Sequence, residues 1–246
     1  MFVILLPAYN EEASISTLFD QIINTLKDEK FHIVVVDDGS SDGTAELVRQ
    51  YASNNPVTLL EHPFNMGLGR AMHTGIEHVC ANWNDEDVLI TMDADNTQNP
   101  VLIHEMWKAK NDGADIVIAS RFVQEGTQVG VPGYRKLLSS GARVLLKRVF
   151  PVGANDYTCG YRLYRLGFLK KAVRDIEPFI ESNGFVVMVE ILLKLSLLKP
   201  TVTEVPLVLR YDLKEGASKL RLVKTLIEYG KILFRFWLTP PSIKSS

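Results

Sequence analysis

Two aspartates separated by a single small residue follow an apolar run near the middle of the chain. Residues 88–92 have the character of a buried strand, and Asp93, Ala94 and Asp95 come directly after it. Since ligands of open α/β sheets bind outside the carboxyl ends of the strands, both carboxylates are expected to reach one site from one turn. Two hard oxygen ligands suit Mg²⁺ or Mn²⁺, and such an ion commonly bridges phosphates. The pattern predicts chemistry on a nucleotide-activated substrate; a polar turn with solvated carboxylates is the competing interpretation.

Further polar residues follow the first predicted strand. Residues 2–6 run into Pro7, Tyr9, Asn10 and Glu11. Asn10 is placed to cap the helix that comes next. Tyr9 is placed to cover a base or a ribose, although an aromatic side chain at a strand end serves packing as often, so both interpretations stay open.

Two adjacent carboxylates, Asp37 and Asp38, come directly after the second predicted strand. Like charges side by side are costly there unless a ligand, a hydrogen-bond donor or a metal uses them. An aspartate in this position can hold a nucleobase or a ribose hydroxyl. Gly67 and Gly69 follow the third strand, but no lysine with serine or threonine completes a P-loop. These glycines serve either a ligand or close helix packing.

Short apolar runs alternate with helix-period stretches through the first half of the chain. This alternation predicts an α/β fold with a mostly parallel central sheet and flanking helices. Residues 123–133 carry three glycines and a proline and are expected to form a mobile loop. The expected strands are residues 2–6, 32–36, 57–60, 87–92, 115–119, 161–164 and 201–209, and the expected helices are residues 13–27, 44–52, 70–81, 101–111, 134–150, 166–175, 186–199 and 220–238.

The composition is that of an ordinary globular protein, with 46% hydrophobic and 23% charged residues among 246. A formal net charge of −2 gives no general attraction to nucleic acid, so no nucleic-acid partner is expected. Two cysteines are too few for a disulfide framework, which makes a cytoplasmic location the default. No run of 18 apolar residues is present, and no membrane span is expected.

Basic residues of the second half are candidates for binding an anion. Arg121 closes the fifth strand, where a guanidinium can hold a phosphate through two hydrogen bonds. Arg135 and Ser139 are four residues apart on a predicted helix and share one face, with a solvated basic face as the alternative. In residues 221–235 basic residues recur among apolar ones, as in helices at a membrane interface. Core-facing and dimer helices show the same pattern.

In order and spacing, these motifs resemble those of the family 2 glycosyltransferases, which have the GT-A fold, and most of all those of the polyprenyl-phosphate (dolichol-phosphate mannose or glucose) synthases. The matching segments are residues 6–11 (LPAYNE), 36–44 (VDDGSSDGT), 65–71 (NMGLGRA), 92–95 (MDAD) and 156–162 (DYTCGYR), and Arg210 with residues 215–219 (EGASK). The resemblance implies one GT-A domain over residues 1–246, with a nucleotide-sugar-binding half (1–120), an acceptor half (121–246) and a C-terminal amphipathic helix.

The resemblance also implies a nucleotide diphosphate-sugar donor and a divalent metal, Mg²⁺ or Mn²⁺. Asp93 and Asp95 would hold the metal. Some relatives use a glutamine two residues after the second aspartate as a third metal ligand. This chain has Thr97 at that position, so the candidates for the third ligand are Thr97 and the adjacent Gln98. The residues that the resemblance places at the donor are Pro7, Tyr9, Asn10, Glu11, Asp37, Asp38, Gly67, Asp93, Ala94 and Asp95.

For the acceptor, the resemblance implies a polyprenyl phosphate that receives a hexose with inversion in a single displacement. A phosphate with a pKa of about 6 is already ionised and needs no strong base. A hydroxyl acceptor would need one, with Asp156 as the candidate. The residues expected at the acceptor phosphate are Arg121, Arg135 and Ser139; the expected catalytic residues are Asp95, Asp156, Arg121, Arg210 and Lys219.

Two other functions stay open: a family 2 transferase acting on a saccharide or another hydroxyl acceptor, and a non-catalytic subunit that binds nucleotide sugars. The clustered carboxylates argue against the second, since an inactive site has no use for them. With a lipid acceptor, we expect peripheral attachment to the cytoplasmic face of a membrane. Either the chain's own surface or a membrane-anchoring partner subunit would attach it to the membrane. A second copy of the chain, in a homodimer, is another possible partner.

Overall fold

Seven strands form one central sheet in the computed structural model, which describes residues 1–214, 222–238 and 241–244. Their order is β3-β2-β1-β4-β7-β5-β8, and only β7 runs antiparallel to its neighbours. The predicted α/β fold with a mostly parallel sheet is confirmed. The strands of this sheet are β1 (Phe2–Ala8), β2 (Phe31–Asp37), β3 (Val57–Glu61), β4 (Val88–Thr91), β5 (Ile116–Ser120), β7 (Arg162–Arg165) and β8 (Val202–Pro206).

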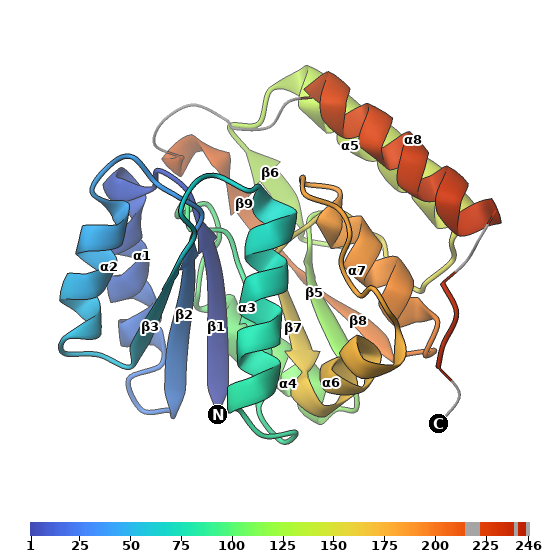
Figure 1. Cartoon of the computed structure of the whole chain (residues 1–246). Coiled ribbons are helices and arrows are strands. Elements are labelled where there is room, and N and C mark those ends of the chain that lie inside the picture. The colour runs from blue at the N-terminus through green and yellow to red at the C-terminus, as the bar shows by residue number, and fades with distance from the viewer. Residues whose placement is uncertain (215–221, 239–240, 245–246) are drawn as a thin grey trace.

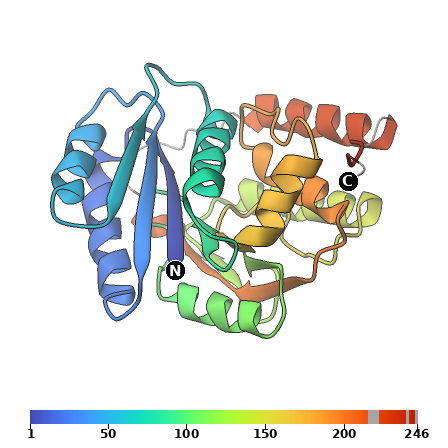
Figure 2. The same ribbon diagram turned by 60° about the horizontal axis from the view of Figure 1, so that its bottom comes forward.

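Helices cover both faces of the sheet (Figure 1, Figure 2). In Figure 1, α3, α6 and α7 lie in front of it and contact one another, while α4 lies behind and packs on β5, β7 and β8. The helix α2 packs on α1 and on β3 at one edge. The helices are α1 (Glu12–Thr25), α2 (Thr44–Ala52), α3 (Leu68–Asn82), α4 (Leu102–Asn111), α5 (Gly133–Val149), α6 (Leu166–Asp175), α7 (Val187–Ser196) and α8 (Leu222–Leu238).

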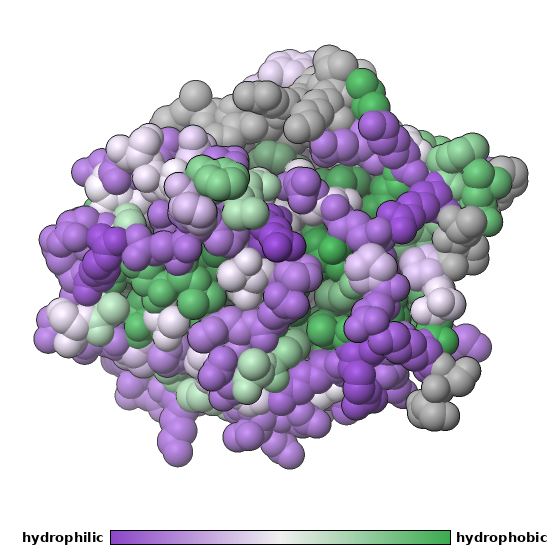
Figure 3. Space-filling model, in the orientation of Figure 1, coloured by the Kyte–Doolittle hydropathy of each residue, from purple (hydrophilic) through white to green (hydrophobic). Residues whose placement is uncertain are grey.

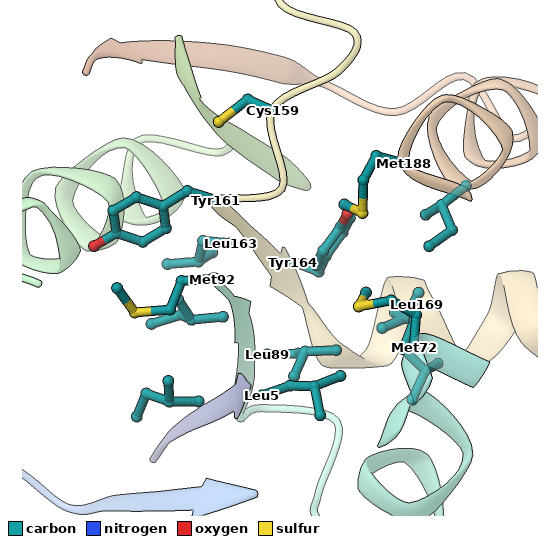
Figure 4. Close-up of a cluster of buried hydrophobic side chains, with 14 of the residues drawn as sticks. Leu5, Met72, Leu89, Met92, Cys159, Tyr161, Leu163, Tyr164, Leu169 and Met188 are labelled. Atoms are coloured by element: carbon teal, nitrogen blue, oxygen red, sulfur yellow. The ribbon is translucent and has the colours of Figure 1, made fainter. Parts of the chain in front are cut away.

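The strands are apolar almost without interruption because both faces of the sheet are covered. Residues 33–36 of β2 are all fully buried, as expected for parallel strands between helix layers. Leu5 and Leu89 of the first half contact a cluster that includes Leu163 and Tyr164 of β7 (Figure 4). The second half of the chain therefore shares a core with the first.

Two expectations about the second half are wrong. Residues 123–133, expected as a mobile loop, contain the strand β6 (Thr127–Val129). Residues 201–209, expected as one strand, divide into β8 and β9 (Val208–Arg210), and β9 pairs in parallel with β6 in a second, small sheet. The chain changes sheets at Leu207, whose N–H donates to Ser120 O of β5 and whose carbonyl accepts the N–H of Thr127 (both 2.9 Å). Pairing between segments so far apart leaves no local signal in the sequence.

The helices α5 and α8 lie on one side of the molecule, at the upper right of Figure 1. Phe150, which follows α5, meets Phe236 of α8 edge to face, with 6.1 Å between the ring centroids. None of the helices in the described part of the chain combines the length and the apolar character that a membrane span requires.

Candidate functional site

The strand order brings three loops to one edge of the sheet. β1 pairs with β2 on one side and with β4 on the other, so the direction in which strands are added reverses between β1 and β4. Ligands of open α/β sheets bind at such a reversal, outside the carboxyl ends of the strands. The segments that follow β1, β2 and β4 carry the predicted donor residues, and the structure brings them together there.

The loops after β1 and β2 are joined by side-chain hydrogen bonds. Ser40 Oγ accepts the N–H of Asn10 (2.8 Å) and donates to Asp37 Oδ1, and Asn10 Oδ1 accepts the N–H of Ser41 (2.8 Å). Asn10 has a φ of +52°, a left-handed conformation that asparagine adopts more readily than most residues. Asp37 is thereby held at the end of β2, beside the segment that carries Tyr9.

Asp38 is buried and uses both carboxylate oxygens on its own chain. Oδ1 accepts the N–H of Met66 (2.9 Å) and lies 2.7 Å from His62 Nδ1, and Oδ2 accepts the N–H of Gly67 (2.7 Å). Asp38 was expected to contact the donor; in this structure its side chain holds residues 65–71 against the end of β2.

Gly67 and Gly69 lie where the turn before α3 meets another backbone segment. The N–H of Gly69 donates to Asn183 O (2.9 Å), and Gly67 has a φ of +94°. A Cβ on Gly69 would lie 1.6 Å from Ser182 O, and one on Gly67 would lie 2.3 Å from Asn183 O. The structure supports close packing as the reason for these glycines, because the chain's own backbone fills the space beside them.

Replacing Gly69 with alanine is expected to lower the free energy of unfolding by about 2–3 kcal/mol, because backbone on both sides must move to admit the methyl group. Urea denaturation measures this. Gly141→Ala on α5 is the matched control: its Cβ would meet nothing within 4 Å, so it is expected to leave stability unchanged or to raise it by up to about 1 kcal/mol. Equal stability of Gly69→Ala and the parent protein would contradict the packing explanation.

The acidic turn, residues 93–95, is held by the residues that follow it. Gln98 Nε2 donates to Asp93 Oδ2 (2.7 Å), and Gln98 Oε1 accepts the N–H of Asp93 (3.0 Å). Thr97 donates its N–H (3.2 Å) and its hydroxyl (2.7 Å) to Asp95 Oδ1. Thr97 and Gln98, the two candidates for a third metal ligand, thus orient the two carboxylates in this structure.

The charges of three carboxylates act on one ammonium at the acidic turn. Burial and the neighbouring Asp95 raise the pKa of Asp93 to about 7. Lys214 Nζ forms an ion pair with Asp95 Oδ2, and the charge of Glu11 acts on both Asp93 and Lys214. Burial alone would lower the pKa of Lys214, but Asp95, Glu11 and Asp93 raise it overall. A cationic side chain therefore lies at the carboxylate where a metal is predicted.

The donor atoms of this turn fit a divalent metal in type. Asp93 and Asp95 offer hard carboxylate oxygens, and burial together with the charge of Asp95 raises the pKa of Asp93, an effect that a bound cation would oppose. Across the described residues, no three or more His, Cys, Asp or Glu side chains are arranged to hold a metal by themselves. Further ligands would come from water and from donor phosphates, as is usual for Mg²⁺.

A bridging loop, residues 156–160, connects the acidic turn to a buried ion pair. At one end, Thr91 Oγ1 donates to Gly160 O (2.6 Å), and a Cβ on Gly160 would lie 3.1 Å from Asp93 Oδ1. At the other end, Asp156 accepts two hydrogen bonds from the Arg121 guanidinium, Nε to Oδ2 and Nη2 to Oδ1, both 2.7 Å. Asp93, predicted for the donor, and Arg121, predicted for the acceptor, therefore lie at the two ends of one loop.

Asp156 is fully buried, and its carboxylate is surrounded by hydrogen-bond donors. Besides the guanidinium, its oxygens accept the N–H groups of Arg121 (3.2 Å), Thr158 (3.2 Å) and Cys159 (3.0 Å). Burial alone would raise the pKa of Asp156, but the ion pair with Arg121 and these hydrogen bonds lower it overall. A carboxylate with no exposed surface and a lowered pKa is a poor general base.

Arg121, Arg143 and Lys147 form a basic cluster beside the bridging loop. The guanidinium carbons of Arg121 and Arg143 lie 5.4 and 5.0 Å from the centroid of the Phe122 ring. Arg143 Nη2 (3.4 Å) and Lys147 Nζ (2.7 Å) donate to Asn155 Oδ1, next to Asp156. Such a cluster attracts an anion to this end of the loop.

The other residues predicted for the acceptor and the leaving group differ in how far the structure describes them. Ser139 Oγ is buried without a hydrogen-bond partner in the described part of the chain. The Arg210 guanidinium is largely exposed and donates to Asp212 Oδ2 (2.8 Å), while its backbone N–H donates to Thr97 O (3.0 Å). The side chain of Arg135 and the whole of Lys219 lie outside the described residues.

Lys214 is the site residue that sequence reasoning missed. It lies 119 residues from Asp95 in the chain and reaches the acidic turn because β9 pairs with β6. The available signal was its place between Arg210 and the matched segment 215–219. That signal was too weak to select Lys214 among neighbouring polar residues.

A mostly parallel sheet that reverses between β1 and β4, with an acidic turn at the reversal, is the GT-A form of the α/β fold. The chain belongs to glycosyl transferase family 2, whose model matches residues 3–172.

Two relatives are similar over most of the chain. A dolichol-phosphate mannosyltransferase of Pyrococcus furiosus is 34% identical over 236 residues, which are 94% of this chain and 62% of the relative. A polyprenol monophosphomannose synthase of Mycolicibacterium smegmatis is 31% identical over 222 residues, which are 88% of this chain and 80% of the relative. The chain thus spans less than two thirds of the length of the Pyrococcus furiosus protein.

Among solved structures, the chain is similar to glucosyl-3-phosphoglycerate synthase of Mycobacterium tuberculosis in complex with Mn²⁺, uridine diphosphate and glucosyl-3-phosphoglycerate. The TM-score is 0.67 at 21% identity, with 100% of this chain and 81% of the other covered. The same enzyme with Mg²⁺ and uridine diphosphate gives a TM-score of 0.67 at 20% identity. At this level of identity the likeness shows a shared fold.

Proposed function

We propose that this chain transfers a hexose from a nucleotide diphosphate-sugar to a polyprenyl phosphate, with inversion at the anomeric carbon. Similarity to a dolichol-phosphate mannosyltransferase and a polyprenol monophosphomannose synthase supports this acceptor class. One structural observation carries the proposal: the bridging loop joins the acidic turn to Arg121. A donor diphosphate at one end of this loop and an acceptor phosphate at the other would be neighbours.

The donor would bind across the loops that follow β1, β2 and β4, in the half formed by residues 1–120. Its base and ribose would lie against Tyr9, Glu11 and Asp37, and its diphosphate would lie at the acidic turn. Asp93 and Asp95 would hold Mg²⁺ or Mn²⁺, which when bound offsets the charge that develops on the leaving diphosphate. Gln98 and Thr97 would keep the two carboxylates in position.

The acceptor would bind to the half formed by residues 121–246. The basic cluster, which includes Arg121, would attract its phosphate, and Ser139 with Arg135 would hold it. A phosphate with a pKa of about 6 is largely ionised at neutral pH and attacks without a strong base. The burial of Asp156 and its lowered pKa support this over a hydroxyl acceptor, because a hydroxyl would need Asp156 as the base.

We propose further that α5 and α8 rest on the cytoplasmic surface of a membrane. Large apolar side chains are exposed on both helices: Val144, Leu145 and Val149 on α5 and Ile227, Phe234 and Leu238 on α8. The basic residues Lys147, Arg148, Lys231 and Arg235 lie among them. Figure 3 shows hydrophobic and hydrophilic side chains next to each other on this side. An apolar surface with basic neighbours suits an anionic leaflet.

Replacing Phe234 with aspartate is expected to weaken binding to vesicles that contain anionic lipid by about tenfold or more, since one large apolar contact is lost and a like charge is added. Vesicle co-sedimentation at low and high salt measures this. Val101→Asp is the matched control: Val101 is 59% exposed and Phe234 is 62% exposed, but Val101 precedes α4. Equal weakening by both substitutions would contradict the assignment. Vesicle binding only in the presence of a membrane-anchoring subunit would also contradict it.

A transfer assay with a panel of donors tests the proposed reaction. GDP-mannose, UDP-glucose and UDP-GlcNAc are each offered with a polyprenyl phosphate and, separately, with the unphosphorylated polyprenol. Glycolipid formation from one donor with the phosphate alone, lost on metal chelation, is the expected result. Transfer to a hydroxyl acceptor, or transfer that survives chelation, would contradict the proposal.

A further inference from the structure

Lys214 lies where a divalent cation would act at the acidic turn. We propose that Lys214 neutralises Asp95 in the donor-free protein, and that this ion pair breaks when a metal and a nucleotide diphosphate bind. The ammonium of Lys214 then moves to the diphosphate. Lys214 would thus be a binding residue for the donor as well as the counter-ion of Asp95 before the donor binds. The inference deepens the proposed function and rests on it.

The contacts of Lys214 make it the natural competitor of a metal. Its ammonium pairs with Asp95 Oδ2, and both side chains are 13% exposed. The other oxygen of Asp95 already accepts two hydrogen bonds from Thr97, which favours Oδ2 as the oxygen for either cation. A metal ion and this ammonium therefore cannot both hold Asp95 in the same way.

The number of available metal ligands decides whether a metal ion or the Lys214 ammonium binds Asp95 in the absence of a donor. Side chains of the described residues do not complete a metal site at the acidic turn, so a metal alone would depend on Asp93, Asp95 and water. The tethered ammonium has an effective concentration that a dissolved metal must overcome. A nucleotide diphosphate adds oxygen ligands to the metal and offers the displaced ammonium a new anionic partner. Exchange is therefore favoured only when metal and diphosphate arrive together.

The backbone keeps Lys214 near the site after it leaves Asp95. Four residues earlier, the N–H of Arg210 donates to Thr97 O (3.0 Å), which ties the end of β9 to the acidic turn. A 3₁₀ helix, Tyr211–Leu213, follows, and the N–H of Lys214 donates to Tyr211 O (3.2 Å). A long, flexible ammonium on this anchored segment can move from Asp95 to a phosphate oxygen beside it without rearrangement of the sheet.

Mn²⁺ binding to the full chain, measured by titration calorimetry and by electron paramagnetic resonance, tests the exchange. Lys214→Met is expected to bind Mn²⁺ alone at least about fivefold more tightly than the parent protein, since the competing ammonium is gone. The same variant is expected to bind GDP or UDP in saturating Mn²⁺ at least about fivefold more weakly, since the diphosphate loses a cationic partner. Opposite changes in the two affinities distinguish exchange from a general loss of structure.

Two variants serve as controls. Lys171→Met removes an exposed lysine on α6 and is expected to leave both affinities unchanged. Lys214→Arg keeps the charge and is expected to keep Mn²⁺ binding weak in the absence of nucleotide. It also tests the inference if Lys214→Met fails to fold.

Two results would overturn the exchange and leave the proposed function intact. One is an equal Mn²⁺ affinity of the parent protein and Lys214→Met. The other is tight binding of Mn²⁺ alone by Lys214→Arg. Absence of Mn²⁺ binding by the parent protein with either nucleotide would overturn both. Exchange observed in a protein that forms no glycolipid would support the role of Lys214 and overturn the proposed acceptor.

Discussion

Replacing Asp95 with asparagine is expected to lower kcat by about 10³-fold or more, with a change of less than about 2 kcal/mol in the free energy of unfolding. Asparagine can still accept the hydrogen bonds that Thr97 donates to Oδ1, so the turn should keep its shape. It cannot supply the negatively charged oxygen that a metal needs. Initial rates at saturating donor and metal, with urea denaturation alongside, separate the two effects.

Asp112→Asn is the matched control for this substitution. Asp112 is exposed at the end of α4, and its replacement is expected to leave kcat within about twofold of the parent value, as for surface substitutions far from a site. An Asp95→Asn variant that retains kcat within about tenfold would contradict a metal-dependent role for the acidic turn. A variant that loses activity because it unfolds would be recognised by its urea midpoint.

Replacing Asp156 with asparagine is expected to destabilise the protein by about 3–5 kcal/mol. The substitution leaves the Arg121 guanidinium buried without a negatively charged partner. Asp156 is 0% exposed and the Arg121 side chain 14%, so solvent replaces little of the lost interaction. The asparagine amide nitrogen would also face the hydrogen-bond donors around it. Asp85→Asn breaks the exposed pair with Lys170 (3.0 Å) and is expected to cost about 1 kcal/mol or less.

The same ion pair predicts how stability depends on acidity. The folded-state pKa of Asp156 lies below its ordinary value, so its stabilisation is fully present above about pH 4, the unfolded value, and is lost as the pH falls through the folded pKa. Urea midpoints measured from about pH 5 downward should fall more steeply for the parent protein than for Asp156→Asn. Parallel pH profiles of the two proteins would show that Asp156 does not carry this dependence.

The edge of the sheet where the donor residues gather could be predicted from the sequence because it depends on strand ends. Asp37 and Asp93 both come where an apolar strand stops, and parallel strands deliver such residues to one edge. The partners that these carboxylates take could not be read in the same way. Asp38 turned out to hold the turn at Met66 and Gly67, and a pattern of adjacent charges does not say whether a ligand or the chain itself satisfies them.

The second half was harder to predict because its contacts join distant segments. The pairing of β6 with β9 brings Lys214 to Asp95, yet the β6 region has the glycines and proline of a loop. Arg121 and Asp156 were expected as separate residues of the acceptor side, and the structure shows them as one buried ion pair. Long-range pairing of this kind is set by the tertiary fold, which local propensity and periodicity do not report.

The bond formed in the transfer reports both the acceptor atom and the configuration at the anomeric carbon. A donor labelled with ¹³C at C1 of the hexose is incubated with the protein, Mg²⁺ or Mn²⁺ and a polyprenyl phosphate, and the product is examined by ¹³C and ³¹P NMR. We expect a product in which labelled C1 is coupled to phosphorus and has the anomeric configuration opposite to that of the donor. A labelled product without coupling to phosphorus, or with the donor's configuration retained, would contradict inverting transfer to a lipid phosphate.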